Sequence, residues 1–485
     1  MDVTTPSYPI RGNHRDGMYH ANHRLAACLE MVGFISYHGS HVVPRDTEQT
    51  GRRSIQKINQ QAPLVICHDG SQFIPDEGNE QEVREHGKKT DPQRYKNTSM
   101  KIAIEAQRIF RTNKHGMDFV ALETIRELQK IDHTHEYYIL VAPGEDHCLE
   151  ESPNFHIVEI KCPTYPLWEQ VALPLAIRHI KPDIVHCTSN TAPLCCPAQL
   201  VLTLHDIIFL EKRVHNNRSM YQNMGWYYRR FVVPRILKKC KQIITVSQFE
   251  CHRIRATLHL PEEQIIAIHN GFSERFHPLD SVYDITKKYI PAQEYLFFLG
   301  NTDPKKNTPH TLKAYSVYVQ QSAHPLPLLI ADLKEEIIHQ ILKQEGIENI
   351  KNMLYSPGYI PHSDLPAIYN GARTFLYTSL RESFGIPLLE AMACGTPVIT
   401  SNTSAIPEIA GDGAILVDPR DANAIARELL KLETNLSYRN QQIAYGLERS
   451  KLFSWQHTAE QLLKIYESIY YEKENINERI YKRKN

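Results

Sequence analysis

Two glutamates, Glu382 and Glu390, have the type and spacing to bind a ligand rich in hydroxyl groups. Both lie in TFLYTSLRESFGIPLLEAMACGTPVITS, 374–401, whose pattern predicts a strand, a loop, a helix and a second strand. Ionised carboxylates accept hydrogen bonds, so Glu382 in the loop could hold sugar hydroxyls and Glu390 in the helix a ribose diol. On spacing alone, a helix cap at Glu382 and a surface position for Glu390 explain the pattern equally well.

The loop before this predicted helix is suited to bind an anion. Pro387 fits the first helical turn, and Gly395 stands where the helix should end. The unpaired N–H groups and the positive dipole end of a helix N-terminus favour a diphosphate. Gly385 lets such a ligand approach the backbone closely. The sequence therefore predicts a diphosphate beside the loop 381–385.

A second candidate for phosphate binding is FLGNTDPKKN, 298–307, where a strand ends in Gly300 and two lysines follow. A diphosphate leaving group gains negative charge as its bond to the sugar breaks, and a nearby cation stabilises that charge. Lys306 and Lys305 could supply it. A turn built on Asp303-Pro304 with solvated lysines is the alternative.

His205 comes just after a predicted strand in LVLTLHD, 200–206, where its side chain could face a ligand. A single histidine at a strand end is more often structural than catalytic. Its position alone therefore does not predict that His205 contacts a ligand.

The elements that must position these residues fall into two sets, each with short apolar strands alternating with helices. The first set contains strands at 100–106, 138–143, 183–187, 200–206 and 242–247, and the second at 295–300, 327–332, 374–380, 397–401 and 414–418. This alternation implies parallel sheets covered on both faces. We expect an α/β protein with two doubly wound Rossmann-like domains facing a cleft. Ligands should bind outside the carboxyl ends of the strands.

Changes in composition suggest the domain boundaries. Residues 1–99 are rich in polar residues, and Met100 would be a natural start. We interpret 1–99 as an extension that is disordered or lies upstream of the true start. The Pro-bearing segment 276–291 is an expected linker. The predicted parts are the extension over 1–99, an acceptor domain over 100–278, a donor domain over 279–472 and a charged tail over 473–485.

The extension holds two H-x-x-H pairs, His20/His23 and His38/His41. Two imidazoles at this spacing can share one helix face and bind zinc. Further spaced ligands are missing from the sequence around them. A solvated polar tail therefore explains the pairs better than a metal site.

Overall composition argues against several function classes. Lysine plus arginine equals aspartate plus glutamate at 55 each, so net charge gives no reason to expect nucleic-acid binding. The sequence contains no apolar run of about 18 residues or more, and its N-terminus lacks the apolar centre of a secretory signal. The 10 cysteines have no paired spacing, which favours reduced thiols and a cytoplasmic location.

The stretch 218–241 combines aromatic residues with arginines and lysines. An ordinary helix with a solvated basic face is the simpler interpretation. The other interpretation is peripheral contact with an anionic membrane, at the inner face of the cytoplasmic membrane.

The segment ESFGIPLLEAMACGTPVI resembles the E-x7-E signature of the family 4 retaining glycosyltransferases, also called group 1 glycosyltransferases. The resemblance continues through Pro407-Glu408 and Asp418-Pro419 to Phe453-Ser454-Trp455. It covers nearly the whole chain from Met100 onward. The resemblance implies the GT-B fold. Within the family, the chain looks like the mannosyltransferases.

The resemblance also implies roles for individual residues. Glu382 would position the donor sugar, Lys306 would stabilise the departing diphosphate, and His205 would contact the sugar near its reacting carbon. The implied donor-binding residues are Gly300, Lys305, Tyr359, Ile360, Ser383, Phe384, Gly385, Ile386 and Glu390, and the implied acceptor residue is Gly116. Many members place an arginine directly after the glycine, where this chain has Asn301, and Lys305 is the candidate for that missing charge. Ser247 and Glu250 also match a family motif, but a capping box explains them better.

We therefore predict a retaining glycosyltransferase that moves a sugar from a nucleotide-sugar, GDP-mannose or a UDP-sugar, to a glycan or lipid-linked acceptor. The nucleotide-sugar is a substrate, and no other cofactor is expected. No metal is expected either, because the sequence has no Asp-x-Asp where a divalent ion would bind. Two alternatives remain: a GT-B phosphorylase or epimerase with related phosphate contacts, and a non-catalytic sugar-nucleotide-binding scaffold.

Overall fold

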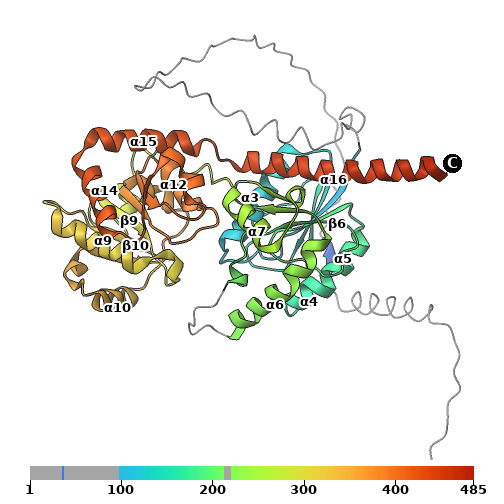
Figure 1. The fold of residues 1–485 in the computed structure, drawn as a ribbon, viewed down its shortest axis with the longest axis horizontal. Helices are drawn as coiled ribbons and strands as arrows, with labels where there is room; N and C mark the ends of the chain where they lie inside the picture. The colour runs from blue at the N-terminus through green and yellow to red at the C-terminus, as the bar shows by residue number, and fades with distance from the viewer. Residues whose placement is uncertain (1–34, 38–97, 212–219, 485) are drawn as a thin grey trace, which may run out of the picture. The chain divides into compact units, whose positions relative to one another are not determined.

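The computed structural model describes residues 35–37, 98–211 and 220–484 (Figure 1). The two H-x-x-H pairs and almost all of the predicted extension lie outside the described residues. A three-residue strand from that region, β1 (Ile35–Tyr37), joins the edge of the first sheet.

The first sheet has the strand order β1-β4-β3-β2-β5-β6-β7-β8 in the described part of the chain. The pairs from β4 to β8 are all parallel. Its other strands are β2 (Lys101–Glu105), β3 (Glu136–Val141), β4 (Phe155–Ile160), β5 (Ile184–Cys187), β6 (Gln199–Thr203), β7 (Cys240–Thr245) and β8 (Ile265–Ala267). Its helices are α3 (Gly116–Ile131), α4 (Tyr165–Leu167), a π-helical turn over Trp168–Ala172, α5 (Leu173–Ile180), α6 (Met220–Ile236) and α7 (Gln248–Leu258). The order reverses between β2 and β5, which makes their carboxyl ends a binding position.

The second sheet is also parallel, in the order β11-β10-β9-β12-β13-β14. Its strands are β9 (Tyr295–Leu299), β10 (Leu328–Ala331), β11 (Leu354–Gly358), β12 (Ala372–Tyr377), β13 (Val398–Ser401) and β14 (Ile415–Val417). Its helices are α8 (Tyr283–Thr286), α9 (Thr308–Gln321), α10 (Glu335–Glu345), α11 (Leu365–Gly371), α12 (Ile386–Ala393), α13 (Ile406–Ala410), α14 (Ala422–Thr434) and α15 (Leu436–Ser450). Here the order reverses between β9 and β12.

Each sheet is buried on both faces, as the apolar strands predict. In β2, Ala103 packs into one core cluster, while Ile102 and Ile104 pack into another on the opposite face. In β9, Phe297 packs into one cluster, while its neighbours Leu296 and Phe298 pack into another on the opposite face. Successive side chains of a strand point to opposite faces, so helices must cover both sides. The predicted pair of doubly wound α/β sheets is confirmed.

The last helix, α16 (Trp455–Lys484), returns to the first sheet. Ala459, Leu462 and Tyr466 are buried in the same cluster as Ile104 of β2. The helix is continuous through most of the predicted charged tail, where Lys473 Nζ lies 3.0 Å from Asp183 Oδ1. Among the described helices, none is long and apolar enough to cross a membrane.

Candidate functional site

The ammonium group of Lys306 and the carboxylate of Glu382 form an ion pair at the carboxyl ends of β9 and β12. Lys306 Nζ donates to Glu382 Oε1 at 2.6 Å, and the two side chains are 25% and 13% exposed. The pair therefore stands at the reversal of strand order, where open α/β sheets bind ligands. The structure brings these two predicted catalytic residues into direct contact.

Asn307 fixes the lysine loop to the glutamate loop. It has a left-handed backbone (φ 61°) and is almost fully buried, and its side-chain amide donates to the carbonyls of Thr378 (3.0 Å) and Pro419 (2.7 Å). The backbone N–H of Leu380 donates to the carbonyl of Lys305 at 2.7 Å. Two loops from different strands thus hold Lys306 against Glu382.

The predicted phosphate-binding loop ends at Gly385, the N-cap of α12, with φ 112°. A side chain is strained at this φ, and a Cβ added here would lie 3.1 Å from Ile406 Cδ1. Pro387 occupies the first turn of α12, as predicted. Because Gly385 is the cap, the alternative in which Glu382 caps the helix is wrong. The amino end of α12, where the helix dipole favours an anion, follows this loop directly.

Tyr377, the last residue of β12, was not singled out from the sequence. Its side chain is buried, and the Lys306 ammonium lies 5.6 Å from the centre of its ring. Burial, and then the charge of and a hydrogen bond to Glu382, hold the pKa of Tyr377 well above its usual range. Its position between strand and loop, TFLYTSLRE, was the only signal available.

Glu390 lies in the middle of α12 and is 6% exposed, so a plain surface role is wrong. Its Oε2 accepts a hydrogen bond from the Tyr369 hydroxyl at 3.3 Å, and its Oε1 lies 3.7 Å from His362 Nε2. Burial raises the pKa of Glu390 to about 7, while Arg275 and the Tyr369 hydroxyl oppose that rise. This carboxyl is therefore close to a change of charge at neutral pH.

Gly116, the predicted acceptor residue, is the first residue of α3, and it is exposed. A Cβ added there would meet no atom within 4 Å, so the space beside it is open. One turn further on, the Phe119 ring stacks on His362 with their centres 5.3 Å apart. Since His362 lies beside Glu390, the start of α3 is close to the predicted ribose-binding residue.

His205 is buried at the carboxyl end of β6. Its Nε2 lies 3.0 Å from the carbonyl of Thr188, and its backbone N–H donates to Asn190 Oδ1 at 2.6 Å. Burial lowers the pKa of His205, and the Thr188 carbonyl opposes that change. His205 is therefore held in one orientation, although no contact joins it to Lys306 or Glu382 among the described residues.

Four further predicted donor residues follow the strands β9 and β11. Gly300 follows β9, and a Cβ there would lie 2.4 Å from Leu333 Cδ1, so the position needs glycine. Lys305 is 39% exposed, and its Nζ lies 3.9 Å from Asp303 Oδ2. After β11, Tyr359 is 74% exposed while Ile360 is buried. An exposed ring beside a strand end is suited to stack on a nucleotide base.

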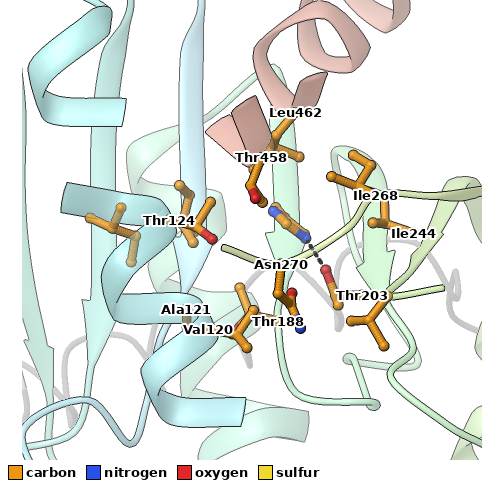
Figure 2. Close-up of a pocket in the computed structure, with 14 residues that line it drawn as sticks. Val120, Ala121, Thr124, Thr188, Thr203, Ile244, Ile268, Asn270, Thr458 and Leu462 are labelled. Atoms are coloured by element: carbon orange, nitrogen blue, oxygen red, sulfur yellow. Dashed lines mark hydrogen bonds between the residues drawn. The ribbon is translucent and has the colours of Figure 1, made fainter. Parts of the chain in front are cut away.

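A separate small cavity of about 40 Å³ lies between α3 and α16 at the first sheet (Figure 2). Its walls combine apolar residues such as Ile104 and Leu462 with polar ones such as Thr188, Thr203 and Asn270. Such a volume holds roughly one water molecule. None of the predicted site residues lines it. The described residues also contain no cluster of three or more potential metal ligands.

Residues 285–449 match the family model described as "Glycosyl transferases group 1", and residues 115–275 match the one described as "Glycosyltransferase Family 4". The O-antigen chain mannosyltransferase B of Escherichia coli is 31% identical over 299 residues, covering 60% of this chain and 76% of that protein. The chain belongs to the group 1, or family 4, glycosyltransferases.

Other similarities agree with this membership. The serotype-specific mannosyltransferase WbdA of Escherichia coli is 28% identical over 312 residues, which cover 60% of this glycosyltransferase but only 37% of WbdA. The solved structure of Alr3699/HepE from Anabaena, in complex with UDP and glucose, superposes with a TM-score of 0.58 at 16% identity. That match covers 76% of this chain and 100% of the other. It supports the GT-B fold.

Proposed function

We propose that this glycosyltransferase moves a mannosyl residue from GDP-mannose to the end of a growing polysaccharide, with retention of the anomeric configuration. The contact between Lys306 and Glu382 at the β9/β12 reversal is the observation that carries the proposal. The choice of mannose is supported by two relatives that are named as mannosyltransferases. A UDP-sugar is the second candidate donor.

The ion pair explains how the site could select a sugar diphosphate. Without ligand, Lys306 and Glu382 neutralise each other in a half-buried position. A donor that enters must give each of them a new partner, or else a buried charge is left alone. Phosphate oxygens suit the ammonium, and sugar hydroxyls suit the carboxylate. A ligand that supplies only one of the two groups would bind poorly.

In the proposed reaction, the bond between the anomeric carbon and the phosphate oxygen breaks and GDP leaves. The acceptor hydroxyl oxygen forms its bond to the same face of the sugar, and its proton passes to the departing phosphate oxygen. Lys306 and the first turn of α12 stabilise the charge that develops on the diphosphate. We propose on this basis that neither a metal ion nor a further cofactor takes part.

Two other residues complete the proposed donor site. Glu390 would accept hydrogen bonds from the ribose diol, with Tyr369 and His362 keeping its carboxylate in place. His205 would contact the sugar near its reacting carbon. Because its Nε2–H faces the Thr188 carbonyl, its Nδ1 would be the atom that accepts a hydrogen bond from a sugar hydroxyl.

The test is transfer from GDP-mannose to a lipid-linked oligosaccharide that ends in mannose. We expect a product whose new linkage is α by the one-bond C–H coupling in NMR, and a rate that EDTA does not change. Appearance of a β linkage would contradict retention, and loss of activity in EDTA would contradict metal independence. Formation of mannose 1-phosphate only when phosphate is added would favour a phosphorylase. Tight GDP binding without transfer to any acceptor would favour a scaffold.

Helix α6 supports the further proposal that the enzyme works in the cytoplasm, peripherally at the membrane surface. Its exposed face carries Met224, Tyr227 and Phe231, which are 53 to 64% exposed. The Arg235 guanidinium lies 3.9 Å from the centre of the Phe231 ring. Apolar rings flanked by cations bind anionic lipid surfaces. Cosedimentation with anionic but not neutral vesicles, lost in Phe231→Ser, is the expected result; equal sedimentation of both proteins would contradict it.

A further inference from the structure

The amino end of helix α7 binds a carboxylate from helix α13. The backbone N–H groups of Gln248 and Phe249 donate to the two oxygens of Glu408, at 2.7 and 2.9 Å. The first N–H groups of a helix have no partner within the helix, and its dipole favours an anion there. His269 Nε2 lies 2.7 Å from the same carboxylate. Burial opposes ionisation, but the hydrogen bonds from His269 and the two N–H groups hold the pKa of Glu408 below its usual range.

Helix α13 connects this carboxylate to the backbone of Glu382. The residues just before α13 are Ser404 and Ala405. The N–H of Glu382 donates to Ser404 Oγ at 3.0 Å, and the N–H of Ala405 points to the Glu382 carbonyl at 3.4 Å. The peptide groups on both sides of Glu382 are therefore held by the segment that Glu408 anchors.

The start of α7 also contacts the loop directly. Ser247, the N-cap of α7, accepts a hydrogen bond from the Glu250 N–H and donates its own hydroxyl to the carbonyl of Ser383 at 2.8 Å. Arg381 lies 3.3 Å from a carboxylate oxygen of the fully buried Glu250. Ser247 is thus a helix cap, as predicted from the sequence. The Glu250 side chain, however, contacts arginines rather than closing the predicted capping box.

We propose that the amino end of α7 is a clamp that positions Glu382 for sugar transfer, with Glu408 as the positioning residue on which it closes. The inference rests on the proposed function. Glu408 touches no reacting group and acts only through α13 and the backbone of Glu382. A catalytic carboxylate must be held within a fraction of an ångström of its working position, and contacts to the backbone on both sides achieve this.

Two variants weaken the contact between the amino end of α7 and the Glu408 carboxylate, one from each side. Gln248→Pro deletes the N–H that binds Glu408 at the first position of α7, where proline is tolerated. The exposed Gln248 side chain is not needed, and Ser247 already has the extended backbone (φ −155°, ψ 156°) that a following proline requires. Glu408→Gln keeps the shape of the side chain and removes its charge.

Helix α10 offers matched controls away from the clamp. Glu335 is its first residue and follows an extended N-cap, Lys334 (φ −79°, ψ 144°), so Glu335→Pro repeats the proline change. Glu336 is exposed, so Glu336→Gln repeats the loss of charge. Neither control should alter the turnover number.

We expect each clamp variant to lower kcat about tenfold while the Kd for GDP changes less than about twofold. The double variant should be no slower than the worse single one, because both changes remove the same contact. Unchanged kcat in both single variants, or losses that multiply in the double variant, would overturn the clamp. A loss of kcat would also overturn the clamp if it parallels a loss of thermal stability and occurs in the controls as well.

Hydrogen exchange of the 382–386 amides provides a second measurement that needs no turnover. The clamp predicts faster exchange at these amides in Gln248→Pro and in Glu408→Gln, with unchanged exchange in the α10 controls. Equal exchange in all proteins would overturn the clamp. If the wild-type protein transfers no sugar but the two variants still show faster exchange, the proposed function is wrong while the clamp stands.

Discussion

At the scale of single residues, Lys306 and Glu382 carry the two opposite charges of the proposed donor site. Lys306→Met should lower kcat by about a hundredfold, because the diphosphate loses its nearest cation in the transition state. Lys305→Met is the matched control, since Lys305 is more exposed and its ion pair among the described residues is with Asp303. Its kcat should fall less than about fivefold. Steady-state kinetics of both variants would decide, and equal losses would show that Lys305 contributes as much as Lys306.

The raised pKa of Glu390 predicts that the stability of the protein depends on pH. Its pKa rises from 4.5 in the unfolded chain to about 7 in the folded one, with burial as the main cause. Between these values the folded state binds more protons, so this group lowers stability progressively as pH rises from about 4.5 to 7. The full cost above pH 7 is of the order of 3 kcal/mol.

Glu390→Gln should therefore unfold like the wild type at pH 5 but be more stable by up to about 3 kcal/mol at pH 8. Urea unfolding at the two pH values measures this. An equal difference at both pH values would mean that Glu390 does not titrate in this range. The same variant should bind GDP more weakly at pH 8, since it has lost the charged acceptor for the ribose.

The sequence predicted the residues whose chemistry is visible in their type. Glu382 and Glu390 could be chosen through the resemblance to the E-x7-E signature, because structural roles explained their spacing alone equally well, and Lys306 through the glycine-ended strand before it. Tyr377 and Asn307 could not be recognised in the same way. Their importance comes from burial and from partners that are distant in the chain, such as Pro419 for Asn307. The residues next to Tyr377 and Asn307 in the sequence do not indicate such contacts.

At the scale of secondary structure, the amino ends of α12 and α3 each carry a glycine, but only the glycine of α12 is restricted by its backbone and its neighbours. Gly385 has φ 112° and a crowded Cβ position, whereas Gly116 has open space around it. Gly385→Ala should cost about 1–3 kcal/mol in unfolding free energy and weaken GDP binding. Thermal unfolding and GDP titration would test this, and an unchanged Kd for GDP would argue against a diphosphate at α12.

Gly116→Ala is the counterpart. We expect stability unchanged within about 0.5 kcal/mol, because the new methyl group meets nothing and the backbone is helical. If an acceptor approaches here, its KM should rise while the KM for GDP-mannose stays constant. Unchanged values of both KM would remove Gly116 from the acceptor site.

The parallel strands could be predicted because each is a short apolar run, and their alternation with helices restricts the topology. The residue ranges of some elements could not. Helix α16 continues to Lys484 through a charged segment, and at its start Glu472 and Lys473 pair with Lys241 of β7 and with Asp183, which precedes β5. Those partners lie far away in the sequence, so the segment looked like a solvated tail.

At the scale of the whole described chain, α16 ties the end of the sequence to the first sheet. The Tyr466 hydroxyl lies 2.6 Å from His186 Nδ1, and burial lowers the pKa of His186 to about 3, which keeps it neutral. Tyr466→Phe should lower the unfolding free energy by about 1–2 kcal/mol, because a buried imidazole nitrogen loses its partner. Chemical denaturation measures this loss. Wild-type stability in the variant would mean that α16 is held by its apolar contacts alone.

Glu382 and Lys306 are the proposed donor site of this glycosyltransferase. The most direct test is the release of nucleoside diphosphate from a panel of GDP-, UDP- and ADP-sugars, with the wild type, Glu382→Ala and Lys306→Ala measured side by side. We predict release from GDP-mannose by the wild type and a loss of at least about a hundredfold in both variants. Wild-type rates in either variant, with the protein folded, would contradict the account.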